Sequence, residues 1–264
     1  MVGDNAAVEG ADGSDADLSP TTMRSNYTQI MAKTIKVSAT ADAVSTYGRA
    51  KETAYQLSKK AAEVKREFEY HLIGKAQNAA AGNTSTARTF GNVWGNDASG
   101  NALIDSSVRV VVDSDTGTAG NQAGALTETH VLTANQRLYE AGGSASYLMI
   151  KPADSLIVAG FAAASGRNRD FATGTKVVNV VDLYVSPFGE QKVVLNRFMK
   201  ADSALLFDPS NWKKCVLRPW TRTLLAKTGD ADRHFMVGEF GLKHVNYKAS
   251  AAITNLTGTN PMLP

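Results

Sequence analysis

The chain has 264 residues, of which 43% are hydrophobic and 20% charged, a balance typical of one or two globular domains with a substantial core. Its single cysteine, Cys215, excludes an internal disulfide and any multi-cysteine metal site, and is interpreted as buried filling. The most apolar run, Leu156 to Ala164, is too short to cross a bilayer, so neither membrane insertion nor secretion is expected.

The net charge of +3 is unevenly distributed along the chain. Residues 1–23 contain five acidic groups and no lysine or arginine, whereas the remainder, with all 28 basic and 20 acidic residues, carries +8. Such an acidic segment is either a solvated tail or a segment that docks on a basic surface of its own or a neighbouring copy. The body has no cluster of basic and aromatic residues, so sequence-specific nucleic-acid binding is not indicated.

The first predicted elements are a strand and a long helix. Alternation and β-branched residues predict an extended strand over Ser25 to Ala39. A helix is predicted from Ala41 to Lys75, with Thr40 and Asp42 as its start signals. Its apolar stripe comprises Val44, Tyr47, Ala50, Ala54, Leu57, Ala61, Val64, Phe68 and Leu72.

At 1.5 Å per residue this helix spans about 50 Å, more than a compact domain of this size normally contains. Because the stripe is rich in alanine and no further heptads follow, a helix lying across a sheet or along a molecular edge is favoured over a coiled coil. Its polar faces place Lys59 one turn before Glu63 and Lys65 one turn before Glu69, which are favourable spacings for ion pairs.

The remaining elements mix helices and strands without regular βαβ alternation, which predicts an α+β protein with a mostly antiparallel sheet. A polar loop over Ala79 to Ala102 has Phe90 and Trp94 as anchors. The other predicted elements are strands over Val108 to Val112 and Tyr147 to Lys151, helices over Thr127 to Ala141 and Pro152 to Ala164, a hairpin joining Lys176 to Val185 with Gln191 to Lys200, and strands over Ala204 to Phe207, Trp212 to Leu217, Thr223 to Ala226 and Arg233 to Tyr247.

No motif for catalysis or cofactor binding is found. The glycines at 117, 120 and 124 lack the Lys-Ser/Thr pair of a phosphate-binding loop, the four histidines are scattered, and no Gly-x-Ser-x-Gly turn is present. We therefore predict no catalytic residue, no cofactor and no metal, and a protein that is not an enzyme.

The strongest candidate for a metal site is the trio Asp230, Asp232 and His234, which alternation in a strand would place on one face. A solvated turn leading into a strand is favoured over this site, because Asp and Gly commonly form turns. Asp182 and Glu239 are candidates for buried carboxylates with shifted pKa values, although no partner for either is evident.

Four stretches of the sequence resemble the major capsid protein family of tailed double-stranded DNA phages, which has the Hong Kong 97-type fold. The stretches are NAAVEGAD (5–12), SNYTQIMAKTIKVSATADAVSTYGRAKETAYQLSKKAAEVKREFE (25–69), LFDPSNWKKCVLRPW (206–220) and LAKTGDADRHFMVGEFGLKHVNYKASAAI (225–253). The resemblance implies an E-loop, a long spine helix on a peripheral P-domain, and an axial A-domain. It implies a partial E-loop and acidic arm over 1–38, a P-domain over 39–125 with its spine helix at 41–75, an A-domain over 126–217, and a return to the P-domain sheet with a C-terminal tail over 218–264.

The resemblance further implies a structural subunit of an icosahedral phage head that self-assembles as hexamers and pentamers around double-stranded DNA. Its expected partners are further copies of the chain, a decoration or cement protein, a portal at one vertex and non-specific contacts with packaged DNA. The expected location is the virion capsid, assembled in the host bacterial cytoplasm. The alternatives are an encapsulin-like compartment shell, a metal-dependent hydrolase using Asp230, Asp232 and His234, and a monomeric binding module.

In such a shell the acidic arm would reach across an adjacent subunit. We therefore expect contacts between arm carboxylates and basic helix residues of the neighbour, with Asp12, Asp15, Asp17, Lys59, Lys60, Lys65 and Arg66 as candidates. Relatives usually carry several tens of residues before the matched segment, so the chain is expected to start partway through the E-loop. Residues 1–32 contain no lysine, so no Lys–Asn isopeptide crosslink is expected through this arm.

Overall fold

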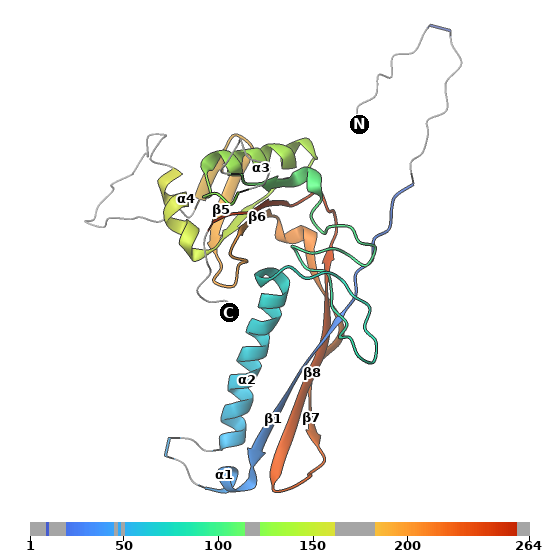
Figure 1. The fold of residues 1–264 in the computed structure, drawn as a ribbon, viewed down its shortest axis with the longest axis vertical. Coiled ribbons are helices and arrows are strands. Elements are labelled where there is room, and N and C mark those ends of the chain that lie inside the picture. The colour runs from blue at the N-terminus through green and yellow to red at the C-terminus, as the bar shows by residue number, and fades with distance from the viewer. Residues whose placement is uncertain are drawn as a thin grey trace, which may run out of the picture.

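The computed structural model of the chain describes residues 9–10, 20–44, 47–48, 51–113, 122–161 and 183–257. Within these ranges the strands form a long three-stranded sheet and a six-stranded sheet, each flanked by helices (Figure 1). This mixture confirms the α+β class. The helices are α1 (Ala39–Ala43), α2 (Glu52–Glu69), α3 (Glu128–Glu140) and α4 (Ser155–Phe161), with a π-helical turn η1 (Tyr70–Gly74) and 3-10 turns at Ser106–Val108, Pro152–Asp154 and Pro209–Asn211.

The long sheet consists of β1 (Gln29–Ser38), β8 (Ala231–His244) and β7 (Trp212–Leu225), in the order β1-β8-β7 with both pairings antiparallel. Along β1, buried residues alternate with exposed ones, so one face of the sheet is covered and the other meets solvent. The pairing of β7 with β8 shifts register on both sides of Arg218, next to Pro219, which has no N–H to donate to a ladder. The two strands predicted at 212–217 and 223–226 are therefore one strand with bulges.

Helix α2 lies along the covered face of this sheet (Figure 1). Lys33 of β1 reaches across to Glu63 at 2.9 Å and Glu67 at 2.5 Å, and the rings of Phe68 and Phe240 lie 5.4 Å apart. Among the 18 residues of α2, however, only Val64 is buried. The helix thus contacts the sheet along one side, and its remaining residues are partly or fully exposed to solvent.

The helix predicted over residues 41–75 is confirmed for Ala41 to Ala43 in α1 and from Glu52 to Gly74, but its continuity between these two stretches is wrong. Helix α1 ends at Ala43, and Val44 already has an extended backbone. Gly48 has φ of +80°, a conformation that glycine adopts without strain and that interrupts a helix. The Asp42 carboxylate accepts a 3.0 Å hydrogen bond from the Thr53 N–H and so supports the new helix start. Tyr47, expected on the apolar stripe, is fully exposed.

The six-stranded sheet has the order β2-β9-β6-β3-β5-β4. Two of its five pairings, β2 with β9 and β3 with β5, are parallel, so the expectation of mostly antiparallel pairing holds for the long sheet and less well here. Its strands are β2 (Arg109–Val111), β9 (Ala251–Thr254), β6 (Ser203–Phe207), β3 (Tyr147–Ile150), β5 (Gly189–Leu195) and β4 (Leu183–Ser186).

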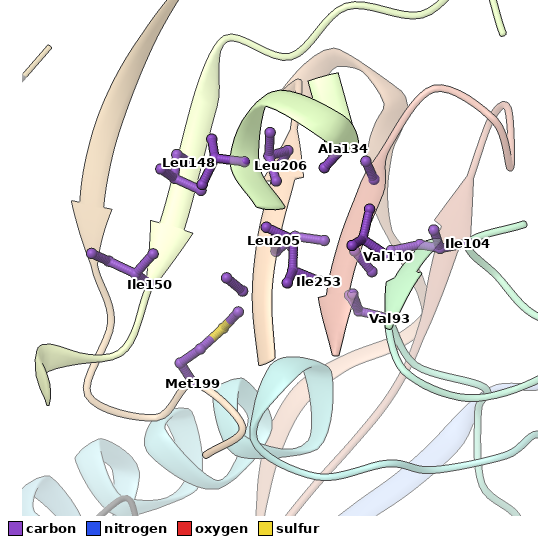
Figure 2. Close-up of a cluster of buried hydrophobic side chains, with 14 of the residues drawn as sticks. Val93, Ile104, Val110, Ala134, Leu148, Ile150, Met199, Leu205, Leu206 and Ile253 are labelled. Atoms are coloured by element: carbon purple, nitrogen blue, oxygen red, sulfur yellow. The ribbon is translucent and has the colours of Figure 1, made fainter. Parts of the chain in front are cut away.

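The main hydrophobic core lies between this sheet and α3. Figure 2 shows Leu148, Leu206 and Ile253 of adjacent strands beside Ala134 of α3, with Met199 closing the lower end of the cluster. Phe90, expected to anchor the loop over 79–102, is completely buried in the same core, and Trp94 packs against it. The loop is therefore fixed to the core by these two side chains, and the Trp94 indole N–H donates to the Ile73 carbonyl at 2.7 Å.

Most of the other short elements agree with the sequence. Thr127 caps α3 with its side chain, and the predicted hairpin is present as β4 and β5, with Ser186 opposite Gly189. Residues 176–182 and 162–164 of the predicted hairpin and helix lie outside the described residues. Strand β9 was not predicted, because its residues are buried on both faces and so show no alternation.

Candidate assembly surfaces

The segment that leads into β1, residues 24–28, is tied to the body by side chains; we call it the arm base. Asn26 uses its whole amide: Nδ2 donates to the carbonyls of Gly91 (2.8 Å) and Leu242 (2.9 Å), while Oδ1 accepts from the N–H groups of Gly91 (2.7 Å) and Tyr27 (2.9 Å). A second tie joins the Ser25 carbonyl to the Ala98 N–H at 2.9 Å. The direction in which the chain leaves β1 is thereby fixed.

Glu239, a candidate buried carboxylate, lies beside the arm base on β8. Its side chain is 6% exposed; it accepts a 2.6 Å hydrogen bond from the Thr28 hydroxyl and pairs with Arg218 at 3.0 Å and Arg88 at 3.6 Å. The Thr28 hydrogen bond, followed by the Arg218 contact, lowers the pKa of Glu239 below its usual value. Asp182, the other candidate, lies outside the described residues.

Three stacked rings, which we call the aromatic column, lie at the C-terminal end of β8. The ring of His244 stacks on Trp212 at 3.8 Å and on Tyr247 at 5.5 Å, and the Arg24 guanidinium covers Tyr247 at 4.3 Å. His244 Nδ1 contacts the Leu103 carbonyl at 2.7 Å and must donate to it, which leaves Nε2 to accept from the Ser250 hydroxyl at 3.1 Å. Burial lowers the pKa of His244 to about 4, so the ring is neutral at physiological pH.

A cavity of about 640 Å³ lies between this column and the arm base, lined by Arg24, Tyr27, His244 and Cys215 among others. Cys215 is exposed, so its interpretation as buried filling is wrong. The reason is positional: β7 is the edge strand of the long sheet, and Cys215 lies on the face that solvent reaches.

The predicted basic residues of α2 are spread over a helix that also holds four glutamates, so α2 has no net charge. Lys60 pairs with Glu63 at 2.6 Å. The anticipated pairs of Lys59 with Glu63 and of Lys65 with Glu69 are not formed, because Glu63 is held by Lys33 and Lys60, and Glu69 accepts from Asn196. Lys59, Lys65 and Arg66 form no ion pair with a described carboxylate. Asp12, Asp15 and Asp17 lie outside the described residues.

Strand β7 is a basic surface that local sequence patterns do not reveal. All of its residues except Trp212 are exposed, and it has four basic residues and no acidic one: Lys213, Lys214, Arg218 and Arg222. It also exposes apolar side chains, with Leu217 at 62%, Leu224 at 59% and Val216 at 53%. An exposed edge strand of this kind is a typical place for another chain to bind.

The candidate metal residues do not converge. Asp232 pairs with Lys227 at 2.8 Å, Asp230 is exposed before β8 begins, and His234 is buried opposite Ile35 of β1. Among the described ranges no group of three or more His, Cys, Asp or Glu side chains is arranged to hold a metal ion. In the same part of the chain no helix is long and apolar enough to cross a membrane.

A helix along a long antiparallel sheet, joined to a mixed sheet with its own helices, is the architecture of Hong Kong 97-type shell proteins. A chain of the satellite phage P4 procapsid matches this structure with a TM-score of 0.57 at 12% identity, covering 97% of this chain and 80% of that chain. An encapsulin of Synechococcus elongatus PCC 7942 matches with a TM-score of 0.55 at 9% identity, covering 87% of this chain and 74% of that one. These matches establish the fold.

Sequence similarity establishes the family. The model of the SU10 major capsid protein family matches residues 2–257. The major capsid protein of Escherichia phage Phieco32 is 32% identical over 290 residues, covering 97% of this chain and 82% of that protein. The chain belongs to the SU10 major capsid protein family and is a major capsid protein of a phage head, as the resemblance predicted.

Proposed function

We propose that copies of this chain assemble as hexamers and pentamers into a closed icosahedral head that encloses a double-stranded DNA genome. The observation that carries this proposal is the exposure of two long elements. Helix α2 buries one residue of 18 and β7 buries none, so both surfaces suit coverage by neighbouring copies. A protein of the capsid family forms a shell from many copies of itself, and its role is structural.

The finer features of this role follow from the same proposal. Residues 1–38, with β1, would form the partial E-loop, residues 39–125, with α2, the peripheral P-domain, and residues 126–217, with α3, α4 and the strands from β3 to β6, the axial A-domain; residues 218–264 would return to the P-domain sheet and end in the C-terminal tail. We propose assembly in the host bacterial cytoplasm, a portal at one vertex, a decoration protein on the shell and non-specific contact with packaged DNA. No catalytic step is part of this function.

The acidic arm supplies a route for contact between copies. Residues 1–23 carry five acidic groups, and the described residues offer basic side chains both on α2, which is neutral as a whole, and on β7, which is basic. Charge reversal of Asp12, Asp15 and Asp17 is expected to weaken assembly or to make it more sensitive to salt. Unchanged shell stability would contradict the contact.

Negative-stain electron microscopy of the purified chain, with size-exclusion chromatography, tests the function directly. The expected result is closed particles of megadalton mass with hexameric and pentameric units. A monomer at all concentrations would contradict the proposal and favour a monomeric binding module.

An encapsulin-like compartment is the second candidate, favoured by the encapsulin match at a TM-score of 0.55. The nucleic acid inside native particles distinguishes the two. Double-stranded DNA of constant length that is protected from nuclease supports a phage head, whereas a protein cargo without nucleic acid supports a compartment.

A further inference from the structure

We propose that β7 of one copy is the docking site for the acidic N-terminal segment, residues 1–19, of a second copy. This inference rests on the proposed assembly function and names the surface that would receive the arm. Strand β7 is the outer strand of the order β1-β8-β7, so the backbone groups on its free side have no strand partner among the described residues. Free edges of this kind are completed by strands from other chains.

The difference in net charge favours β7 over α2 as the docking surface. The 14 residues of β7 carry four positive charges and no negative one, and only Arg218 among them is paired, with Glu239, whereas α2 is neutral and its Lys60 is paired with Glu63. In the β7–β8 register Lys213 lies opposite Lys243, a like-charge cross-strand pair that is unfavourable in the isolated subunit. A carboxylate from another chain would relieve that repulsion.

The composition of residues 1–19 is complementary to that of β7. Residues 1–19 carry all five acidic groups of the N-terminal region and otherwise consist mostly of Gly, Ala, Ser, Val and Leu, which allow close backbone approach. Nineteen extended residues span about 60 Å, and the 14 residues of β7 span about 45 Å. The arm is thus long enough to follow the whole strand, and its apolar residues have Val216, Leu217 and Leu224 to cover.

The direction in which the arm base runs indicates that the arm docks on β7 of a second copy rather than on β7 of its own copy. Gln29 at the start of β1 lies opposite Phe240, which in turn lies opposite Val216 of β7. From that level residues 24–28 continue past the end of β8 toward Ala98 and Tyr247, away from the β7 stretch that holds Arg222 and Leu224 (Figure 1). To reach that stretch within its own copy, the arm would have to fold back along the sheet.

Charge exchange tests the proposal. We choose Lys213→Glu with Arg222→Glu on β7, because neither side chain forms an ion pair with a described residue, and Lys36→Glu with Lys192→Glu as a control with the same change in net charge. The expected result is that K213E/R222E raises the concentration needed for half-maximal assembly about tenfold, while K36E/K192E does not. Equal effects of the two pairs would overturn the proposal.

Rescue identifies the partner. Adding D12K/D15K/D17K to K213E/R222E is expected to restore assembly, because opposite charges again face each other. If the reversed arm instead restores assembly of K59E/K65E, the arm docks on α2 and the proposal is wrong. If the wild-type chain forms no particles at all, the proposed function fails, an outcome distinct from wild-type particles that ignore changes on β7.

Cys215 allows a test of whether the arm docks on its own copy or on another copy, because this residue is exposed on β7 and is the only cysteine in the chain. A pool carrying Asp15→Cys with Cys215→Ser is mixed with wild-type chain, assembled and oxidised. A disulfide-linked dimer on a denaturing gel is expected in the mixture but not when either chain is assembled and oxidised alone, because those two controls report links between copies of the same chain. Absence of the dimer, with an internal disulfide in the single Asp15→Cys variant, would show that the arm docks on its own copy and would overturn the proposal.

Discussion

The hydroxyl of Thr28 donates a 2.6 Å hydrogen bond to Oε1 of Glu239, and this contact joins the arm base to the central strand of the long sheet. The other carboxylate oxygen, Oε2, accepts from Arg218 of β7 at 3.0 Å. One buried carboxylate therefore holds together the arm base, β8 and the proposed docking strand. Its charge should contribute to the stability of this junction.

Replacing Glu239 with Gln keeps the shape of the side chain and removes the charge. At neutral pH we expect the free energy of unfolding to fall by about 1.5–3 kcal/mol, the usual range for a hydrogen bond to a charged group. Because folding lowers the pKa of Glu239, its stabilisation is present above 4.5 and is lost as the pH falls through the lower folded-state value. The difference between the two proteins should shrink toward zero in acid.

Urea unfolding of the unassembled subunit from neutral to strongly acidic pH measures this difference. Glu190→Gln, on the exposed part of β5, is the control and should change little. A difference that stays constant with pH would show that the introduced glutamine perturbs packing rather than removing a stabilising charge.

Acid should also weaken the junction through His244. The pKa of His244 is about 4 in the folded chain against 6.5 for an ordinary histidine, so the unfolded chain binds a proton that the folded chain does not. Stability is therefore complete above 6.5 and decreases as the pH falls toward 4, by roughly 3 kcal/mol at most. Titration of the ring resonances by NMR checks this prediction, and a midpoint near 6.5 would contradict it.

Local sequence signals were sufficient to predict several helices and strands but not others. The alternation of residues 25–39, the cap at Thr127 and the turn at Ser186 each act over a few residues and predicted β1, α3 and the β4–β5 hairpin. The break before α2 depends on one glycine with positive φ and on the contact between Asp42 and Thr53. The periodicity of the apolar stripe predicts neither of these features.

The surfaces themselves depend on contacts between distant parts of the sequence. Asn26 meets Gly91 and Leu242, which lie 65 and 216 residues away, and no spacing rule brings these together. Whether Cys215 is buried depends on β7 being an edge strand, which only the strand order reveals. The sequence did supply the charge asymmetry, because that quantity needs no coordinates.

Asn26→Ala should release the arm base without unfolding the body. The variant loses the four hydrogen bonds of one amide, three of which join the arm base to Gly91 and Leu242. We expect faster hydrogen exchange across residues 24–29, unchanged exchange in the core strand β6, and a higher concentration for assembly, because an arm without a fixed direction loses more entropy on docking. Asn83→Ala, in an exposed turn, is the matched control; equal exchange in both variants would mean that Asn26 does not position the arm.

Lys151 should be essential to the core of the six-stranded sheet. Its side chain is 1% exposed, and its ammonium group donates to the Ala201 carbonyl and, at 2.8 Å, to that of Thr257, and lies 3.5 Å from Asp154. Burial raises the pKa of Asp154, and the Lys151 charge works against that rise, so removing the lysine leaves two carbonyls without a donor and a buried carboxylate without its counter-ion. Lys151→Met should therefore cost about 3 kcal/mol or more of unfolding free energy.

A double-mutant cycle, measured by urea unfolding, separates the ion pair from the two carbonyl contacts. If the pair with Asp154 dominates, K151M/D154L should recover most of the loss, since two apolar side chains replace two buried charges. If the carbonyls of Ala201 and Thr257 dominate, the double variant stays as unstable as K151M, because both acceptors remain buried without a donor. The geometry favours the second result, because Nζ of Lys151 lies 2.8 Å from the Thr257 carbonyl oxygen and 3.5 Å from the carboxylate of Asp154.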